Sequence, residues 1–166
     1  MSDEEQEPLT PQAALDQKYM KLALEQAELA AQIGEVPIGA VVVCGGEVVA
    51  AAHNRREIDN DPSAHAEFLA MQKASKKLGR WRLSGCTVYV TLEPCLMCAG
   101  LMVNARINRC VFGAFDPKGG ATGTLFDVSS DSRLNHEFAV LGGVLAEEAS
   151  AQLKAFFKER RQVNKL

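Results

Sequence analysis

The sequence of 166 residues lacks any apolar run of about 18 residues, the length that a membrane-spanning helix requires. Residues 1–8 are acidic and contain no apolar stretch, so they resemble neither a secretory signal nor an Arg-rich, acid-poor transit peptide. These absences predict a protein without a membrane segment that works in the cytoplasm. The sequence also contains no internal repeat and no convincing domain boundary.

A net basic charge is also missing, although nucleic-acid-binding domains often have one. The formal net charge is −3, but four of the 21 acidic residues lie within residues 1–10, which contain no Lys or Arg. We expect residues 1–10 to form a disordered acidic tail and residues 11–166 to form one domain. Because that domain is nearly neutral, RNA binding would need a local basic patch.

The cysteines do not indicate a disulfide framework. Their number is five, which is odd, and no secretory signal precedes them. Cys44, Cys86 and Cys110 lie within or beside apolar, strand-like runs, which is typical of buried free thiols. Cys95 and Cys98 are left as candidates for chemistry.

Hydrophobic periodicity predicts an alternation of helices and strands. Because such an alternation needs crossover connections, it implies an α/β sheet covered by helices on both faces. Residues 116–136 are rich in Gly, Asp, Ser and Thr and predict a long loop. The expected helices are residues 12–33, 62–78, 94–104 and 145–163, and the expected strands are residues 36–43, 48–52, 87–91, 109–114 and 138–141.

Two short motifs carry the chemistry: His65-x-Glu67 and Pro94-Cys95-x-x-Cys98. Cysteines three positions apart share one face of a helix, and a helix start favours thiolates. His65, Cys95 and Cys98 form a donor set that suits zinc, and three protein ligands leave a position for water, as in catalytic zinc sites.

Glu67 is poorly placed to bind the same metal, because positions i and i+2 do not share a face of a helix. Its carboxylate could instead take a proton from a metal-bound water and deliver it to a substrate. Taken alone, Cys-x-x-Cys also fits a structural zinc knuckle or a redox pair. The joint pattern matches the zinc deaminase signature and favours a catalytic zinc site.

These residues resemble the cytidine/nucleobase deaminase superfamily, and the surrounding segments resemble its tRNA adenosine deaminase family. The similarity to that family covers nearly the whole chain after the acidic tail and lies in residues 35–41, 53–54, 65–67, 91–100, 112–123, 134–136 and 156–161. The sequence departs from the family pattern at residues 50–52, 115 and 119–120. These departures affect fine substrate contacts rather than the zinc chemistry.

The resemblance implies a three-layer α/β/α cytidine-deaminase-like fold with a central mixed five-stranded sheet, one Zn²⁺ per subunit and a homodimer. It also implies that residues 11–166 form a zinc-dependent nucleobase deaminase domain, a hydrolase. The implied reaction converts the wobble adenosine of a tRNA anticodon to inosine, with the arginine tRNA bearing ACG as the usual bacterial substrate. By motif matching, Asn54 and the backbone of Ala66 would hold the base, Val36 and Leu92 would line its pocket, and Asp116 would contact the anticodon backbone.

RNA recognition needs cations for phosphates and flat groups for stacking. We expect Phe157, Arg160 and Arg161 on the last helix to contact the anticodon stem-loop, with the basic segment of residues 73–82 as a second candidate. Two other functions remain open at this point. One is a deaminase of guanine or of a cytosine nucleoside or nucleotide. The other is a silent zinc protein that binds RNA, although an intact Glu67 argues against it.

Overall fold

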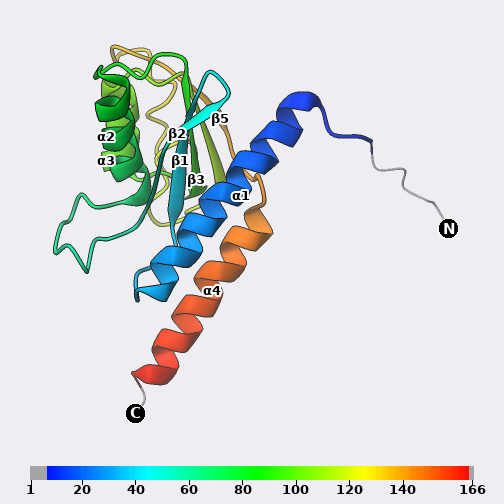
Figure 1. Ribbon diagram of the computed structural model, residues 1–166, viewed down its shortest axis with the longest axis vertical. Coiled ribbons are helices and arrows are strands. Elements are labelled where there is room, and N and C mark those ends of the chain that lie inside the picture. The colour runs from blue at the N-terminus through cyan, green and yellow to red at the C-terminus, as the bar shows by residue number, and fades with distance from the viewer. Residues whose placement is uncertain (1–6, 165–166) are drawn as a thin grey trace.

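A five-stranded sheet lies between two layers of helices in the computed structural model, which describes residues 7–164 (Figure 1). The strand order is β2-β1-β3-β4-β5. The β1 strand runs antiparallel to β2 and β3, whereas β3, β4 and β5 are parallel. Helices α1 and α4 cover one face of the sheet, and α2 and α3 cover the other. This is the mixed, three-layer α/β/α arrangement that the family resemblance implied.

The elements follow one another with short connections, apart from the loops between β2 and α2 and between β4 and β5. Their bounds are α1 Pro11–Gln32, β1 Gly39–Cys44, β2 Glu47–His53, α2 Ala66–Leu78, β3 Cys86–Leu92, α3 Leu96–Asn104, β4 Arg109–Ala114, β5 Ala139–Leu141 and α4 Ala146–Val163. None of the helices in residues 7–164 is long and apolar enough to cross a membrane.

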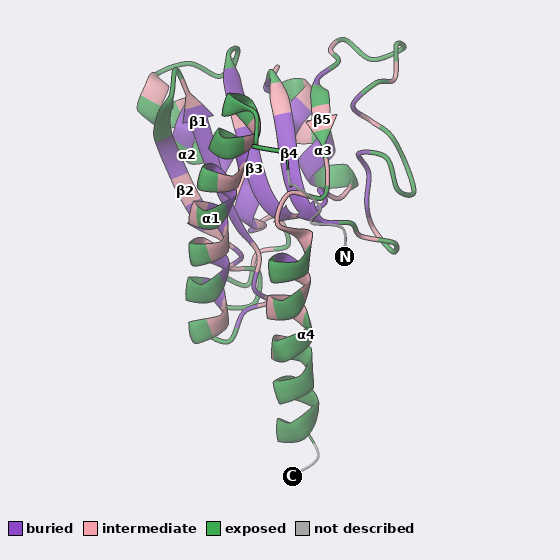
Figure 2. Cartoon of the chain, turned by 90° about the vertical axis from the view of Figure 1, so that its right-hand side faces the viewer, coloured by how far each residue is buried: buried purple, intermediate pink, exposed green. Residues whose placement is uncertain are grey.

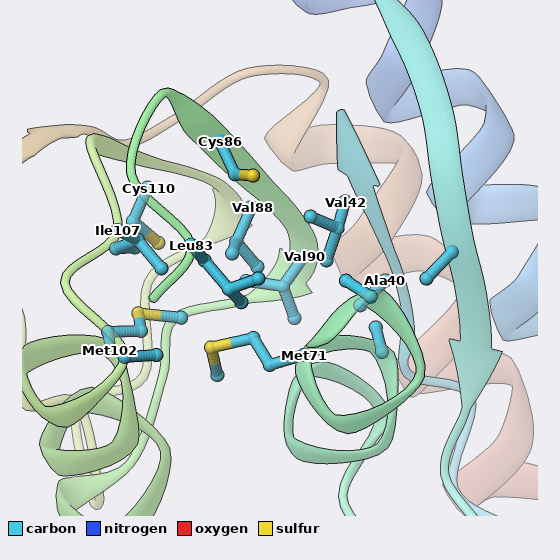
Figure 3. Packing of buried hydrophobic residues seen from close by; sticks show 14 of the residues in the cluster. Ala40, Val42, Met71, Leu83, Cys86, Val88, Val90, Met102, Ile107 and Cys110 are labelled. Atoms are coloured by element: carbon cyan, nitrogen blue, oxygen red, sulfur yellow. The ribbon is translucent and has the colours of Figure 1, made fainter. Parts of the chain in front are cut away.

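Alternation of side chains along the central strands builds two apolar cores. Val42 and Val88 face α2 and α3, where they join the cluster drawn in Figure 3. Their neighbours in the sequence, Val41 and Tyr89, point to the opposite face of the sheet and pack against α1. Because both faces of β1 and β3 are buried, these strands consist almost entirely of apolar residues.

Helix α1 is also fixed to the sheet by a buried ionic group. The Asp16 carboxylate accepts two hydrogen bonds from the Arg109 guanidinium, at 2.8 and 2.6 Å, and one from the Tyr89 hydroxyl at 2.7 Å. These hydrogen bonds hold the pKa of Asp16 below its usual value, against the opposing effect of its burial. The contact sets the position of α1 over β3 and β4.

Helix α4 is held mainly by its first half. Ala149 is its only buried residue, and the helix continues beyond the edge of the sheet with mostly exposed side chains (Figure 2). It begins after Leu145, which adopts a left-handed backbone conformation with φ of 53°. Its last turns therefore reach toward the segment that follows α1 rather than toward a core.

Three predicted boundaries differ from the structure by two or more residues. The β1 strand begins at Gly39 instead of residue 36, and α3 begins at Leu96 instead of Pro94. The second helix begins at Ala66, not at Pro62, because the Asp61 carboxylate accepts hydrogen bonds from the amide and hydroxyl of Ser63 and closes a turn there. Of the predicted acidic tail, residues 1–6 lie outside the described residues, and residues 7–10 precede α1 without regular structure.

The backbone of Gly39 packs directly against α1. A methyl group at this position would overlap with backbone atoms of Ala23 and Ala27. Gly100, on the exposed side of α3, has open space around it. The two glycines therefore differ in packing.

We expect Gly39→Ala to lower the free energy of unfolding by about 2 kcal/mol or more, because α1 would have to move off the sheet. Gly100→Ala is the matched control and should raise it by about 0.5–1 kcal/mol, since alanine favours a helix interior. Urea denaturation measures both changes. Equal effects of the two substitutions would contradict the close approach at Gly39.

Candidate active site

The predicted metal ligands come from the first residues of two helices. His65 is the N-cap residue of α2, Cys95 is the N-cap residue of α3, and Cys98 lies in the first turn of α3. The Nδ1 atom of His65 lies 3.6 Å from the Sγ atom of each cysteine. All three donor atoms lie within 4.8 Å of one another. The structure thus brings together three groups that could hold one metal ion.

The local backbone leaves these donor atoms available. Neither His65 nor Cys95 uses its side chain to cap its helix, although both occupy the position where capping side chains normally act. The N-terminal ends of α2 and α3 carry partial positive charge, which favours anionic ligands such as thiolates. Side chains that would ordinarily satisfy helix amides are instead free to coordinate an ion.

The protonation of the cluster reflects its close packing. The pKa of Cys95 is lowered to about 4, chiefly because the Cys98 thiol donates a hydrogen bond to its thiolate. The pKa of Cys98 is raised by the same contact, and the pKa of His65 is raised by its hydrogen bond to Cys95. A divalent cation would replace the shared protons, and a donor set of two sulfurs and one imidazole nitrogen suits zinc.

Glu67 lies beside this cluster, at the second position of α2, and is only 4% exposed. Burial raises the pKa of its carboxyl group to about 7, while the neighbouring charge of His65 acts in the opposite direction. Among the described residues, the group of potential metal ligands consists of His65, Cys95 and Cys98 and does not include Glu67. The position is compatible with the proton-carrying role predicted from the sequence.

A cavity of about 240 Å³ shares His65 with the ligand cluster. Its volume is small for a ligand pocket and suits a single flat ring system better than a whole nucleotide. Predicted substrate contacts from distant parts of the chain meet here. The lining residues are Val36, Ile38, Asn54, Arg56, His65, Ala66 and Phe157.

Asn54 connects two of the segments that line this cavity. Its Nδ2 atom donates a hydrogen bond to the carbonyl oxygen of Val36 at 3.3 Å, and its Oδ1 atom accepts one from the amide of Arg56 at 3.1 Å. The side chain therefore holds the cavity wall in addition to its predicted contact with a base. Ile38 and Arg56 were missed by sequence reasoning, because they occupy an apolar run and a polar loop with no pattern that distinguishes them.

Leu92 and Asp116 are not part of the cavity lining. Leu92 is the last residue of β3 and is partly buried. The Asp116 carboxylate accepts hydrogen bonds from the amides of Lys118 and Gly119 within its own loop, at 3.0 and 3.1 Å. Its predicted contact with RNA stays a prediction.

The two arginines at the end of α4 differ in their surroundings. The Arg160 guanidinium donates a hydrogen bond to the carbonyl oxygen of Gly34 at 2.7 Å and lies 5.0 Å from the ring centre of Phe156. It thus ties the end of α4 to the segment after α1. Arg161 is exposed, as is much of the neighbouring Phe157.

The second basic segment is partly occupied by contacts within the chain. Arg80 donates hydrogen bonds to the carbonyl oxygens of Arg82 and Ser84. Trp81 is 59% exposed, and the guanidinium groups of Arg82 and Arg106 lie 4.8 and 6.0 Å from the centre of its indole ring. None of these residues lines the cavity beside His65.

Known proteins similar to this chain are deaminases. The family profile of MafB19-like deaminases matches residues 15–161. The tRNA-specific adenosine deaminase of Bacillus subtilis (strain 168) is 53% identical over 150 residues, which are 90% of this chain and 93% of that protein. The tRNA-specific adenosine deaminase of Haemophilus influenzae (strain ATCC 51907 / DSM 11121 / KW20 / Rd) is 45% identical over 152 residues, which are 91% of this chain and 88% of that protein.

The solved structures that resemble this chain are also those of deaminases. One comes from work on A-to-I editing by tRNA:A34 deaminases at the wobble position of transfer RNA. It is 43% identical to this chain, with a TM-score of 0.79, and the match covers 82% of this chain and 99% of that one. The guanine deaminase of Nitrosomonas europaea is 25% identical, with a TM-score of 0.71, over 94% of this chain and 97% of that one.

We expect Cys98→Ala to reduce the zinc content from about one ion per chain to nearly none, because two ligands rarely retain zinc where three are needed. Glu67→Ala should leave the zinc content unchanged. Cys110→Ala is the control, since its buried thiol lies outside the ligand group. Elemental analysis of the purified variants decides between these outcomes, and zinc loss in Glu67→Ala would mean that its carboxylate is a ligand.

Proposed function

This chain belongs to the tRNA-specific adenosine deaminase family, and from that membership we propose that it converts the wobble adenosine of a tRNA anticodon to inosine by hydrolytic deamination. The observation that carries the proposal is the cavity of about 240 Å³ that shares His65 with the His65, Cys95 and Cys98 ligand cluster. We propose the arginine tRNA with an ACG anticodon as the substrate, because this is the usual substrate of the bacterial family.

His65, Cys95 and Cys98 would hold one zinc ion per subunit. When bound, zinc supplies a Lewis acid that lowers the pKa of water and so provides a nucleophile at neutral pH. Glu67 would carry out the proton transfers, because its buried carboxylate lies next to the ligand cluster. It would accept a proton from the water and return it to the leaving amino group, so that adenosine and water become inosine and ammonia.

The cavity would receive the base after it leaves the anticodon stack. An anticodon loop is already single-stranded, which lowers the free energy needed to expose the base. Val36 and Ile38 provide apolar walls, while Asn54 and the backbone of Ala66 provide polar groups at the cavity surface. Leu92 lies at the end of β3, three residues before Cys95, and would complete the wall on the metal side.

Residues near the cavity mouth would bind the rest of the anticodon loop. Phe157 lines the cavity and is 45% exposed, so its ring is available for stacking on a neighbouring base. Arg160 and Arg161 follow it on the same helix and would contact phosphates. Asp116 would accept a hydrogen bond from a ribose hydroxyl, the group that distinguishes RNA from DNA.

We also propose that the protein is a cytoplasmic homodimer. A tRNA substrate supports a cytoplasmic reaction, and the family resemblance implies two subunits. The exposed apolar side chains of Leu96 and Met97 at the start of α3 support a second subunit, which would cover them. Sedimentation at the mass of a single 18.0 kDa chain, with zinc bound, would rule out the dimer.

A guanine deaminase is the second candidate, because the Nitrosomonas europaea enzyme shares the fold over 94% of this chain. Free guanine needs only the cavity, whereas a tRNA also needs the surface around its mouth. Incubation of the protein with each of these two substrates therefore distinguishes the two candidate functions.

Incubation of the zinc-loaded protein with arginine tRNA should produce inosine at the wobble position, with one ammonia released per inosine. Free guanine and free cytidine should release none. Glu67→Ala should lower the editing rate by about 100-fold or more, the usual effect of losing a general acid-base group. Ammonia from guanine but not from tRNA would replace the proposal with the second candidate.

We expect Arg161→Ala to weaken tRNA binding and to make its salt dependence shallower, by about 0.7 in the slope of log K against log salt for one lost phosphate contact. Arg160→Ala should weaken tRNA binding as well. Unlike Arg161→Ala, it should also lower the free energy of unfolding, because it removes the hydrogen bond to Gly34. Lys18→Ala, an exposed charge near the start of α1, is the control. An unchanged slope for Arg161→Ala would remove this residue from the RNA surface.

A further inference from the structure

Glu93 is a buried carboxylate for which the proposed reaction has no direct use. It follows the last residue of β3, precedes Pro94 and the ligand Cys95, and is 2% exposed. A buried carboxylate is costly unless hydrogen bonds compensate for the lost water. The contacts of Glu93 therefore show what its charge does in the fold.

The carboxylate of Glu93 accepts all of its hydrogen bonds from one loop. Its Oε1 atom accepts a hydrogen bond from the amide of Asp116 at 3.1 Å and another from the hydroxyl of Thr124. Its Oε2 atom accepts hydrogen bonds from the amides of Thr122 and Thr124, at 3.3 and 3.1 Å. Both oxygens are thus paired, and both ends of the loop of residues 116–124 are attached to one side chain.

The same loop closes tightly around that side chain. A methyl group on Gly120 would overlap with the Glu93 carboxylate, so any larger residue there would have to displace that carboxylate. The amide of Ala121 donates a hydrogen bond to the carbonyl oxygen of Pro94 at 2.8 Å, which attaches the loop to the residue directly before Cys95. The loop has no helix of its own, and its one bridge joins Thr122 to Asp127.

We propose that Glu93 is a positioning residue that couples the metal-ligand turn to the substrate-facing loop of residues 116–124. In this role the carboxylate holds Asp116 in the orientation in which it meets the RNA, and the loop would shift if that carboxylate were altered. The part of the inference that concerns RNA rests on the proposed function; the part that concerns the loop does not.

Glu93→Gln tests the coupling with little change in shape. The amide nitrogen of glutamine is a donor, so one end of the side chain would face the loop amides without accepting from them. Thr124→Val removes only the hydroxyl contact and leaves all charges unchanged, whereas Thr124→Ser keeps that hydroxyl. Asp16→Asn is the matched control, because it neutralises another buried carboxylate, which lies on α1 and is bound to Arg109 on β4.

The first measurement does not depend on activity. Lys118 is an exposed trypsin site within the loop. Glu93→Gln should increase the rate of cleavage after Lys118 by about tenfold, because losing a buried hydrogen-bond partner raises the population of the open loop by about this factor. Thr124→Val should give a smaller increase, and Thr124→Ser and Asp16→Asn should give none. An unchanged rate in Glu93→Gln would overturn the proposal.

The second measurement separates positioning from a structural role at the metal. Zinc content should be retained in Glu93→Gln, and KM for tRNA should rise by about tenfold while kcat changes much less, because the loop contacts the substrate outside the reacting base. Loss of zinc, or a fall in kcat with KM unchanged, would overturn the proposal. If the wild-type protein does not edit tRNA, the proposed function fails, and the cleavage experiment still decides whether Glu93 holds the loop.

Discussion

The meeting of two helix starts, those of α2 and α3, is the constraint on which the rest of the structure depends. At each start the N-cap position is occupied by a candidate metal ligand, His65 or Cys95, whose side chain does not cap the helix. The helices can converge in this way because both pack on one face of the sheet, through the cluster that contains Val88 and Val90 (Figure 3). The fold therefore directs two regions of positive helix dipole toward one point, where they favour thiolates and a developing negative charge.

The sequence predicted which side chains meet at the candidate metal site better than it predicted their surroundings. His65, Glu67, Cys95 and Cys98 have spacings that only a small number of structures can use, so the motif identifies them without knowledge of the fold. The helix starts were less predictable, because Asp61 and Pro62 have the residue types of a cap and a first turn but form a separate turn with Ser63. Local preference and tertiary context favoured different starting points, and tertiary context determined the outcome.

The cavity wall and the loop could not be predicted because they depend on contacts between segments far apart in the chain. Arg56 lines the cavity together with the distant Val36 and Phe157, and Glu93 organises residues that lie 23 to 31 positions later. Arg160 looked like a phosphate ligand from its charge, yet in the structure it also stabilises the segment after α1 through Gly34. A single charge can serve both folding and binding, and sequence alone does not separate the two.

The overhang of α4 beyond the sheet divides the molecule into a rigid and a compliant part (Figure 2). The ligand cluster lies at the starts of α2 and α3, two helices that pack on the sheet, whereas the turns that carry Phe157 rest on few buried contacts. A helix end of this kind opens locally at a much lower free energy than a core strand does. We therefore expect thermal motion to concentrate at the end of α4, which forms one wall of the cavity through Phe157, while the starts of α2 and α3 keep a fixed geometry.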